Sequence, residues 1–249
     1  MPRIDFNCDL GEGCGDDAAI MPWISSANIA CGAHAGDDAT IRETLRLCHV
    51  HGVVVGAHPG YADREHFGRR ELALPHAELV ALVRDQIALM DRLAREQGLT
   101  LRHVKPHGAL YNQSAREPDI AAAIAEAVRD HDPSLLLVGM SGTVSIEAAQ
   151  AAGLRTAHEV FAERGYGPDG RLLPRGTPGA VLASAAATAQ ALGFALRNAI
   201  ALHDGRTLRL QADTLCLHGD RADAADFAHA LHTALTEAGV RIHSLEPQR

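Results

Sequence analysis

Residues 53–60 read Val-Val-Val-Gly-Ala-His-Pro-Gly, a short apolar run that ends in a histidine flanked by glycine and proline. Three consecutive β-branched residues favour a strand, and the glycines allow a tight turn after it. The same unit, an apolar run with a polar side chain at its end, recurs along the chain. Strands are predicted at 3–6, 27–31, 53–55, 103–104, 135–138, 155–157 and 215–217, with a short final strand at 240–243.

Helix signals fill the segments between these strands. Asp37 or Asp38 can cap a helix that runs to 51, and Pro75 can open a long one that closes at Gly98. Further helices are predicted at 118–131, after the fifth strand, at 180–202 apart from one glycine, and at 221–238. Strands that alternate with helices predict parallel pairing with right-handed crossovers. Seven or eight such units predict an α/β fold: a single-domain (β/α) barrel over 1–249, seven-stranded and distorted relative to a TIM barrel. A doubly wound open sheet is the alternative.

Composition narrows the class of protein. The 249 residues are 47% hydrophobic and carry a net charge of −8, which argues against nucleic-acid binding. No apolar run approaches the ~20 residues that cross a bilayer, and residues 1–6 show no export pattern. The five cysteines form no Cys-x-x-Cys pair, as expected of free thiols in a reducing compartment. The sequence therefore predicts a cytoplasmic protein without nucleic-acid or membrane partners.

Lys105 is the only lysine among 23 basic residues. Every other basic position is an arginine, and the chain is also rich in alanine, which indicates a compositional drift toward arginine. A lysine carries a compact charge with a tunable pKa, whereas an arginine carries a permanent charge on a rigid, planar guanidinium group. The single lysine is therefore predicted to have a role that arginine cannot fill.

Polar side chains stand at the ends of six predicted strands, which is where a β/α barrel carries its active site. They are Asp9, Glu12, His34, His58, Lys105, His107, Glu159, His218 and Asp220. Asp9 and Glu12 suit a general base and an electrostatic partner. His34 and His58 suit either proton transfer or, with Asp9, a divalent metal such as zinc. The metal remains unassigned, because no His-Glu-x-x-His motif is present.

Two long loops, 60–74 and 167–178, are expected at the same face as lids or docking surfaces. Arg70 or Arg164 could clamp a carboxylate through two parallel hydrogen bonds. The chain has no P-loop, since proline follows its one lysine, and no Gly-x-Ser-x-Gly elbow. Any nucleotide therefore binds without a P-loop or on another chain.

Five ordered segments together resemble the LamB/YcsF family, the A subunits of 5-oxoprolinases. They are Asn-Cys-Asp-Leu-Gly-Glu-Gly at 7–13, Ser-Ser-Ala-Asn-Ile-Ala-Cys-Gly-Ala-His-Ala-Gly-Asp at 25–37, Gly-Ala-His-Pro-Gly at 56–60, His-Val-Lys-Pro-His-Gly-Ala-Leu-Tyr-Asn at 103–112 and Cys-Leu-His-Gly-Asp at 216–220. The resemblance implies a barrel related to the glycoside hydrolase and deacetylase folds. It implies ATP-dependent opening of 5-oxoproline to glutamate, with ATP as co-substrate and subunits B and C as partners.

The resemblance also implies roles for individual residues. Asp9 or His58 would activate water, and Lys105 would stabilise negative charge. His107, Glu159 and His218 would orient the lysine and the lactam ring. The substrate would contact Glu12, Asn28, His34, Arg70, Tyr111, Arg164, His218 and Asp220. A stand-alone metal-dependent lactam or amide hydrolase, or a deacetylase, is the alternative function; a non-catalytic scaffold would not need a buried polar cluster.

Overall fold

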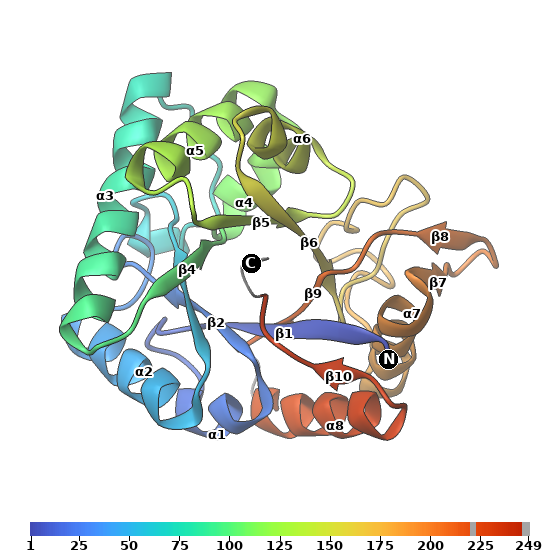
Figure 1. The fold of residues 1–249 in the computed structure, drawn as a ribbon. Coiled ribbons are helices and arrows are strands. Elements are labelled where there is room, and N and C mark those ends of the chain that lie inside the picture. The colour runs from blue at the N-terminus through green and yellow to red at the C-terminus, as the bar shows by residue number, and fades with distance from the viewer. Residues whose placement is uncertain (220–222, 246–249) are drawn as a thin grey trace.

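Seven parallel strands close into a barrel (Figure 1). The computed structural model describes residues 1–219 and 223–245. The barrel strands, in spatial order, are β1 (Arg3–Leu10), β2 (Ser26–Ala30), β3 (Val54–His58), β4 (Leu101–Val104), β5 (Leu136–Met140), β6 (Arg155–Phe161) and β9 (Thr214–His218). β9 pairs with both β6 and β1, which closes the sheet. The predicted seven-stranded barrel is confirmed, and the open sheet is wrong for this chain.

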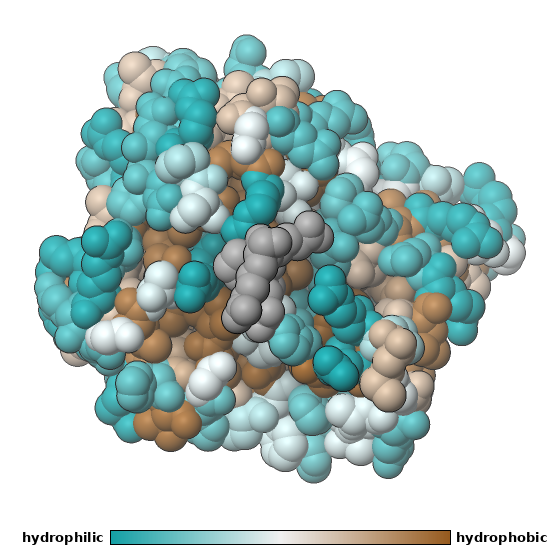
Figure 2. All heavy atoms as spheres, viewed as in Figure 1, coloured by the Kyte–Doolittle hydropathy of each residue, from teal (hydrophilic) through white to brown (hydrophobic). Residues whose placement is uncertain are grey.

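Helices surround the barrel (Figure 1). They are α1 (Asp17–Ile20), α2 (Asp38–His51), α3 (His76–Glu96), α4 (Gly108–Ser114), α5 (Pro118–His131), α6 (Val144–Ala151), α7 (Ser184–Arg197) and α8 (Ala224–Glu237), with 3-10 turns at Met21–Trp23 and Arg64–His66. In Figure 2, most side chains around the edge of the molecule are hydrophilic. No helix in the described ranges is long and apolar enough to cross a membrane.

The main correction to the predicted elements lies at 180–202. Helix α7 covers only Ser184–Arg197, and Asn198 ends it in the left-handed conformation, with φ 48°. The chain then forms an antiparallel hairpin of β7 (Ala199–Ala201) and β8 (Thr207–Arg209). The alanine-rich composition favours helix throughout this segment, but an asparagine tolerates the left-handed cap better than most residues.

The first strand shows how the barrel divides polar from apolar side chains. Ile4, Phe6, Cys8 and Leu10 are buried in the apolar core. The alternate residues are buried as well, but hydrogen-bond to other barrel strands: Asp5 to Thr214, Asn7 to Glu159, and Asp9 to Asn28. Period-two alternation therefore sends a polar column into the barrel interior. The short β10 (Arg241–Ile242) pairs with the start of β1, as predicted for a final strand.

We expect Gly56→Ala to destabilise the barrel strongly. Gly56 lies on β3, where a Cβ would overlap the ring of His103 on β4. The His103 ring is buried and its Nε2 lies 2.8 Å from Asn28 Oδ1. Overpacking together with a weakened hydrogen bond should cost about 3–4 kcal/mol, or a Tm lower by roughly 6–16 °C.

Gly52→Ala is the matched control for this substitution. Gly52 ends α2 with φ 69°, and a Cβ there meets nothing within 4 Å. The control should lose only about 1 kcal/mol of left-handed backbone strain. Thermal melting of both variants measures the difference, and equal melting temperatures would contradict the packing of His103 against Gly56.

Candidate active site

Lys105 lies just after β4 in the barrel interior and is the centre of the site. Its side chain is almost fully buried, with Nζ 2.8 Å from Asp9 Oδ1, 2.9 Å from Glu159 Oε1 and 3.0 Å from Cys216 Sγ. Burial by itself would lower the pKa of Lys105, but the two carboxylates outweigh burial and raise it well above its usual value. The single lysine is therefore a charged, fixed ammonium group.

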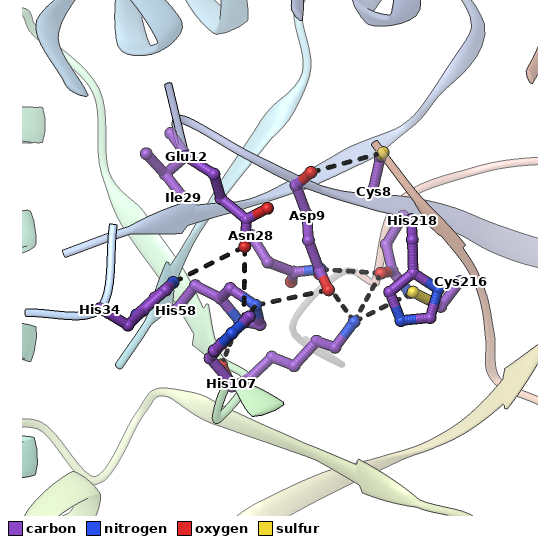
Figure 3. A network of polar contacts seen from close by, with 12 residues as sticks. Cys8, Asp9, Glu12, Asn28, Ile29, His34, His58, His107, Cys216 and His218 are labelled. Atoms are coloured by element: carbon purple, nitrogen blue, oxygen red, sulfur yellow. Dashed lines mark hydrogen bonds and ion pairs between the residues drawn. The ribbon is translucent and has the colours of Figure 1, made fainter. Parts of the chain in front are cut away.

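Asp9 is the carboxylate between Lys105 and the histidines. Its Oδ1 also accepts a hydrogen bond of 2.9 Å from Asn28, and its Oδ2 lies 3.4 Å from His58 Nε2. Burial would raise the pKa of Asp9, but His58 and Lys105 hold it well below its usual value. Figure 3 shows Asp9 between His58 on one side and Cys216 and His218 on the other.

A layer of polar side chains beneath Lys105 supports the site. Asn7 donates to Glu159 and to Thr214, and its Oδ1 accepts from Asn28. Asp5 accepts from Ser25, Ser26 and Thr214 at the next layer down. Sequence reasoning missed Asn7, Asp5 and His103, although the alternation Asp5, Asn7, Asp9 along β1 was a signal that could have found two of them.

Four polar residues form a second group beside Asp9: Glu12, His34, His58 and His107. All four are buried, and their side chains converge in Figure 3. The rings of His34 and His107 stack at 3.8 Å. Burial, reinforced by His58, lowers the pKa of His107 to about 3. Burial likewise lowers the pKa of His34, so both imidazoles are neutral. Of the metal set suggested by sequence, His34 and His58 belong to this group, and Asp9 lies beside it, with Oδ2 3.4 Å from His58 Nε2.

His218 at the end of β9 is held by a residue that sequence reasoning gave no role. Glu163, just after β6, is buried and makes a short hydrogen bond with His218 Nδ1. Burial would raise the pKa of Glu163, but His218 lowers it below its usual value. The His218 ring also stacks against Phe161, at 5.6 Å between centroids. Glu163 therefore fixes the orientation of His218.

A cavity of about 450 Å³ opens onto Asp9, His58, Lys105, His107 and His218. Six basic side chains and two carboxylates, Asp9 and Glu71, line its wall, and these carboxylates pair with Lys105 and Arg116, which leaves an excess of arginines. The basic side chains are Arg69, Lys105, Arg116, Arg164, Arg171 and Arg175. Both long loops contribute to the wall, as expected of loops at the active-site face of a barrel. This positive cavity in a chain of net charge −8 suits an anionic small molecule.

The remaining predicted site residues divide into those at the cavity and those away from it. Tyr111 lines the cavity, and Asn28 lies in the layer beneath it. Arg164 also lines it, but two of its donors are used by the carbonyl groups of Leu173 and Ala180. Arg70 points elsewhere, since its side chain is 56% exposed and its Nε lies 3.3 Å from Asp63. Asp220 lies outside the described residues.

Comparisons with known proteins identify a family and full-length relatives of this chain. The LamB/YcsF family model matches residues 4–249. The A subunit of a 5-oxoprolinase from Erwinia tasmaniensis is 47% identical, and the match covers 97% of this chain and 99% of that protein. A lactam utilization protein from Thermus thermophilus superposes with a TM-score of 0.93 and 43% identity, over 98% of this chain and 100% of that one.

A more distant likeness concerns the fold alone. The peptidoglycan deacetylase PdaC of Bacillus subtilis superposes with a TM-score of 0.50 and 12% identity, covering 98% of this chain and 88% of that one. This similarity confirms the expected relation to the deacetylase fold. The family model and the full-length relatives are more specific, and together they show that the chain belongs to the LamB/YcsF family.

Proposed function

We propose that this chain is the lactam-binding component of an ATP-dependent 5-oxoprolinase that acts with subunits B and C. The observation that supports this function best is the cationic cavity that ends at Lys105, Asp9 and His58. Its basic wall suits the carboxylate of 5-oxoproline and a transferred phosphoryl group. Full-length relatives are named as the A subunits of 5-oxoprolinases, a name that implies an assembly.

The reaction has to activate a stable amide. Transfer of the γ-phosphoryl group of ATP to the lactam oxygen makes the ring carbon electrophilic. Water adds to that carbon and loses a proton, the C–N bond breaks, and the ring nitrogen gains a proton. A second water molecule releases phosphate from the resulting acyl phosphate and leaves glutamate.

The site offers residues for several demands of this reaction. Asp9 lines the cavity and is the proposed general base. The Lys105 ammonium group stabilises negative charge on the phosphoryl group or the oxyanion. Glu159 holds Lys105 in place, and His218 lies at the cavity wall with its ring fixed by Glu163. Arg69, which packs over Phe67 beside the cavity, is the proposed partner of the substrate carboxylate.

Glutamate and ADP formation from 5-oxoproline and ATP tests the proposal. The chain is assayed alone and then with its B and C partners. Coupled production of glutamate and ADP only in the complete mixture is the expected result. If the same partners are active with a relative of this chain but not with this chain, the proposed substrate is wrong.

A stand-alone metal-dependent amide hydrolase or deacetylase is the second candidate. The group Glu12, His34, His58 and His107 favours it, because these are metal-ligand side chains beside the cavity. This candidate predicts amide hydrolysis by the chain alone, without ATP, and loss of that activity on chelation.

We expect Arg69→Ala to raise KM for 5-oxoproline, while Arg70→Ala leaves KM within about twofold. Arg69 lines the cavity, whereas the neighbouring Arg70 points toward Asp63 outside it. A charge-assisted hydrogen bond is worth about 1.5–3 kcal/mol, so KM should rise roughly 10- to 100-fold. Steady-state kinetics of the assembled enzyme measure both variants. Equal KM values for the two would remove Arg69 from carboxylate binding.

A further inference from the structure

Two buried imidazoles in the second group, those of His58 and His107, point ring nitrogens without a proton at each other. His58 Nδ1 lies 2.7 Å from the carbonyl oxygen of Lys105, and His107 Nε2 lies 2.9 Å from that of Phe67. A carbonyl oxygen only accepts, so each of these nitrogens carries the ring's proton. If both rings are neutral, His58 Nε2 and His107 Nδ1 each carry a lone pair and no proton, yet the two atoms lie 2.9 Å apart. Two lone pairs at this distance repel each other unless a positive charge bridges them.

His34 adds a third nitrogen that lacks a hydrogen bond. The residue is 1% exposed, and neither ring nitrogen has a hydrogen-bond partner among the described residues. Its Nε2 lies 3.6 Å from Glu12 Oε1, and the same oxygen lies 3.4 Å from His107 Nδ1. A buried polar atom without a hydrogen bond is costly, so this ring indicates a missing partner.

The backbone around the rings keeps them in this arrangement. A Cβ on Gly60 would lie 2.7 Å from His34 Nδ1, and one on Gly68 would lie 2.8 Å from His34 Cβ and 3.1 Å from His107 Cδ2. Gly68 also has φ 62°, which favours glycine. Two glycines therefore pack directly on His34, one of them against Nδ1, and Nε2 is left to face Glu12.

We propose that Glu12, His34, His58 and His107 bind one divalent transition-metal ion, with zinc the best match. Imidazole nitrogen and carboxylate oxygen bind zinc at about 2.0–2.2 Å, which places tetrahedral ligands about 3.3–3.6 Å apart. The separations of 2.9, 3.4 and 3.6 Å lie near this range, and all four ligand atoms lie within 4.8 Å of one another. Small side-chain shifts would complete the coordination.

The ion would face the reaction cavity, because His58 and His107 also line the cavity wall. An ion there can polarise an amide carbonyl or lower the pKa of a bound water. The site does not depend on the identity of the lactam, on ATP or on the partner subunits. Its test therefore uses metal binding rather than turnover.

The experiment measures metal content and affinity in the full chain, purified without a polyhistidine tag. Metal is removed with a chelator, and Zn²⁺ or Co²⁺ is added back. Elemental analysis gives the stoichiometry, competition with a chromophoric chelator gives the affinity, and visible absorption of Co²⁺ reports imidazole coordination. The expected result is one ion per wild-type chain, with a Tm that rises on zinc addition. His34→Gln and Glu12→Gln should each weaken zinc binding at least about 100-fold.

Two further histidine variants show whether the ion is held by this group and not by histidines elsewhere in the chain. His158 is half-buried outside the group, so His158→Gln should keep one ion with wild-type affinity. His218→Gln removes a residue of the other cluster, Asp9, Cys216 and His218, and should also keep the ion. Loss of binding in His218→Gln with retention in His34→Gln would overturn the proposal. Absence of binding to the wild-type chain would overturn it too, and a proton shared by His58 and His107 would then account for their short contact.

Discussion

Lys105→Met should reduce turnover of 5-oxoproline by about 10³-fold or more while the chain remains folded. The substitution keeps a long apolar side chain but removes the ammonium group that contacts Asp9 and Glu159. Negative charge that develops during phosphoryl transfer and water addition would then lose the ammonium group proposed to stabilise it. Glutamate formation by the assembled enzyme measures the effect, and full activity in this variant would exclude the proposed role.

Loss of stability has to be separated from loss of chemistry in this variant. Breaking a buried ion pair leaves uncompensated carboxylates and costs about 3–5 kcal/mol. We therefore expect a lower Tm, and the assay belongs well below it. Lys105→Ala provides the second measurement, because it opens space beside the cavity. Added ethylammonium should partly restore its activity, which a purely structural lysine would not allow.

Lys105→Arg is the sharpest test of why this chain keeps a single lysine. Nζ has three short contacts, to Asp9, Glu159 and Cys216. A planar guanidinium group is larger and cannot direct its donors to three converging partners in the same volume. The variant keeps the charge, so its failure would show that compact geometry, and not charge alone, is required.

The barrel and the strand-end residues were predictable because their signals are local. Each β-branched run predicts a strand, and parallel pairing brings the carboxyl ends of all strands to one face. Lys105, Asp9, His58 and Glu159 were found on this basis, and the structure places them within one cavity or directly beneath it. The exact residues at which the strands end were less predictable. β1 reaches Leu10 and β6 reaches Phe161, whereas the sequence predicted ends at 6 and 157.

Those strands were predicted too short because polar residues were treated as strand ends. In the structure Asn7 and Glu159 hydrogen-bond across the barrel interior, where neighbouring strands satisfy them. A single sequence does not show such pairing, since the partners are 152 residues apart. The different orientations of Arg69 and Arg70 could not be predicted either. Neighbouring arginines on a loop have equal sequence signals, and only the path of the loop decides which one faces the cavity.

Asp9→Asn should lower turnover by about 10²–10⁴-fold with little change in structure. The amide has the shape of the carboxylate, and its oxygen can still accept from Lys105 and Asn28. It cannot accept a proton from water, so the proposed base is lost. Lys105 keeps its contact with Glu159, and the ammonium group stays in place.

Asp5→Asn is the matched control for this prediction. Asp5 and Asp9 lie on the same face of β1, four residues apart, and both are buried and hydrogen-bonded. Asp5 contacts Ser25, Ser26 and Thr214, none of which lines the reaction cavity. Its substitution should lower the Tm but leave kcat within about twofold of wild type. If both variants lose activity equally, the effect of Asp9→Asn is structural. If Asp9→Asn retains more than about a tenth of wild-type turnover, the base is another residue at the cavity, and His58 is the first to examine.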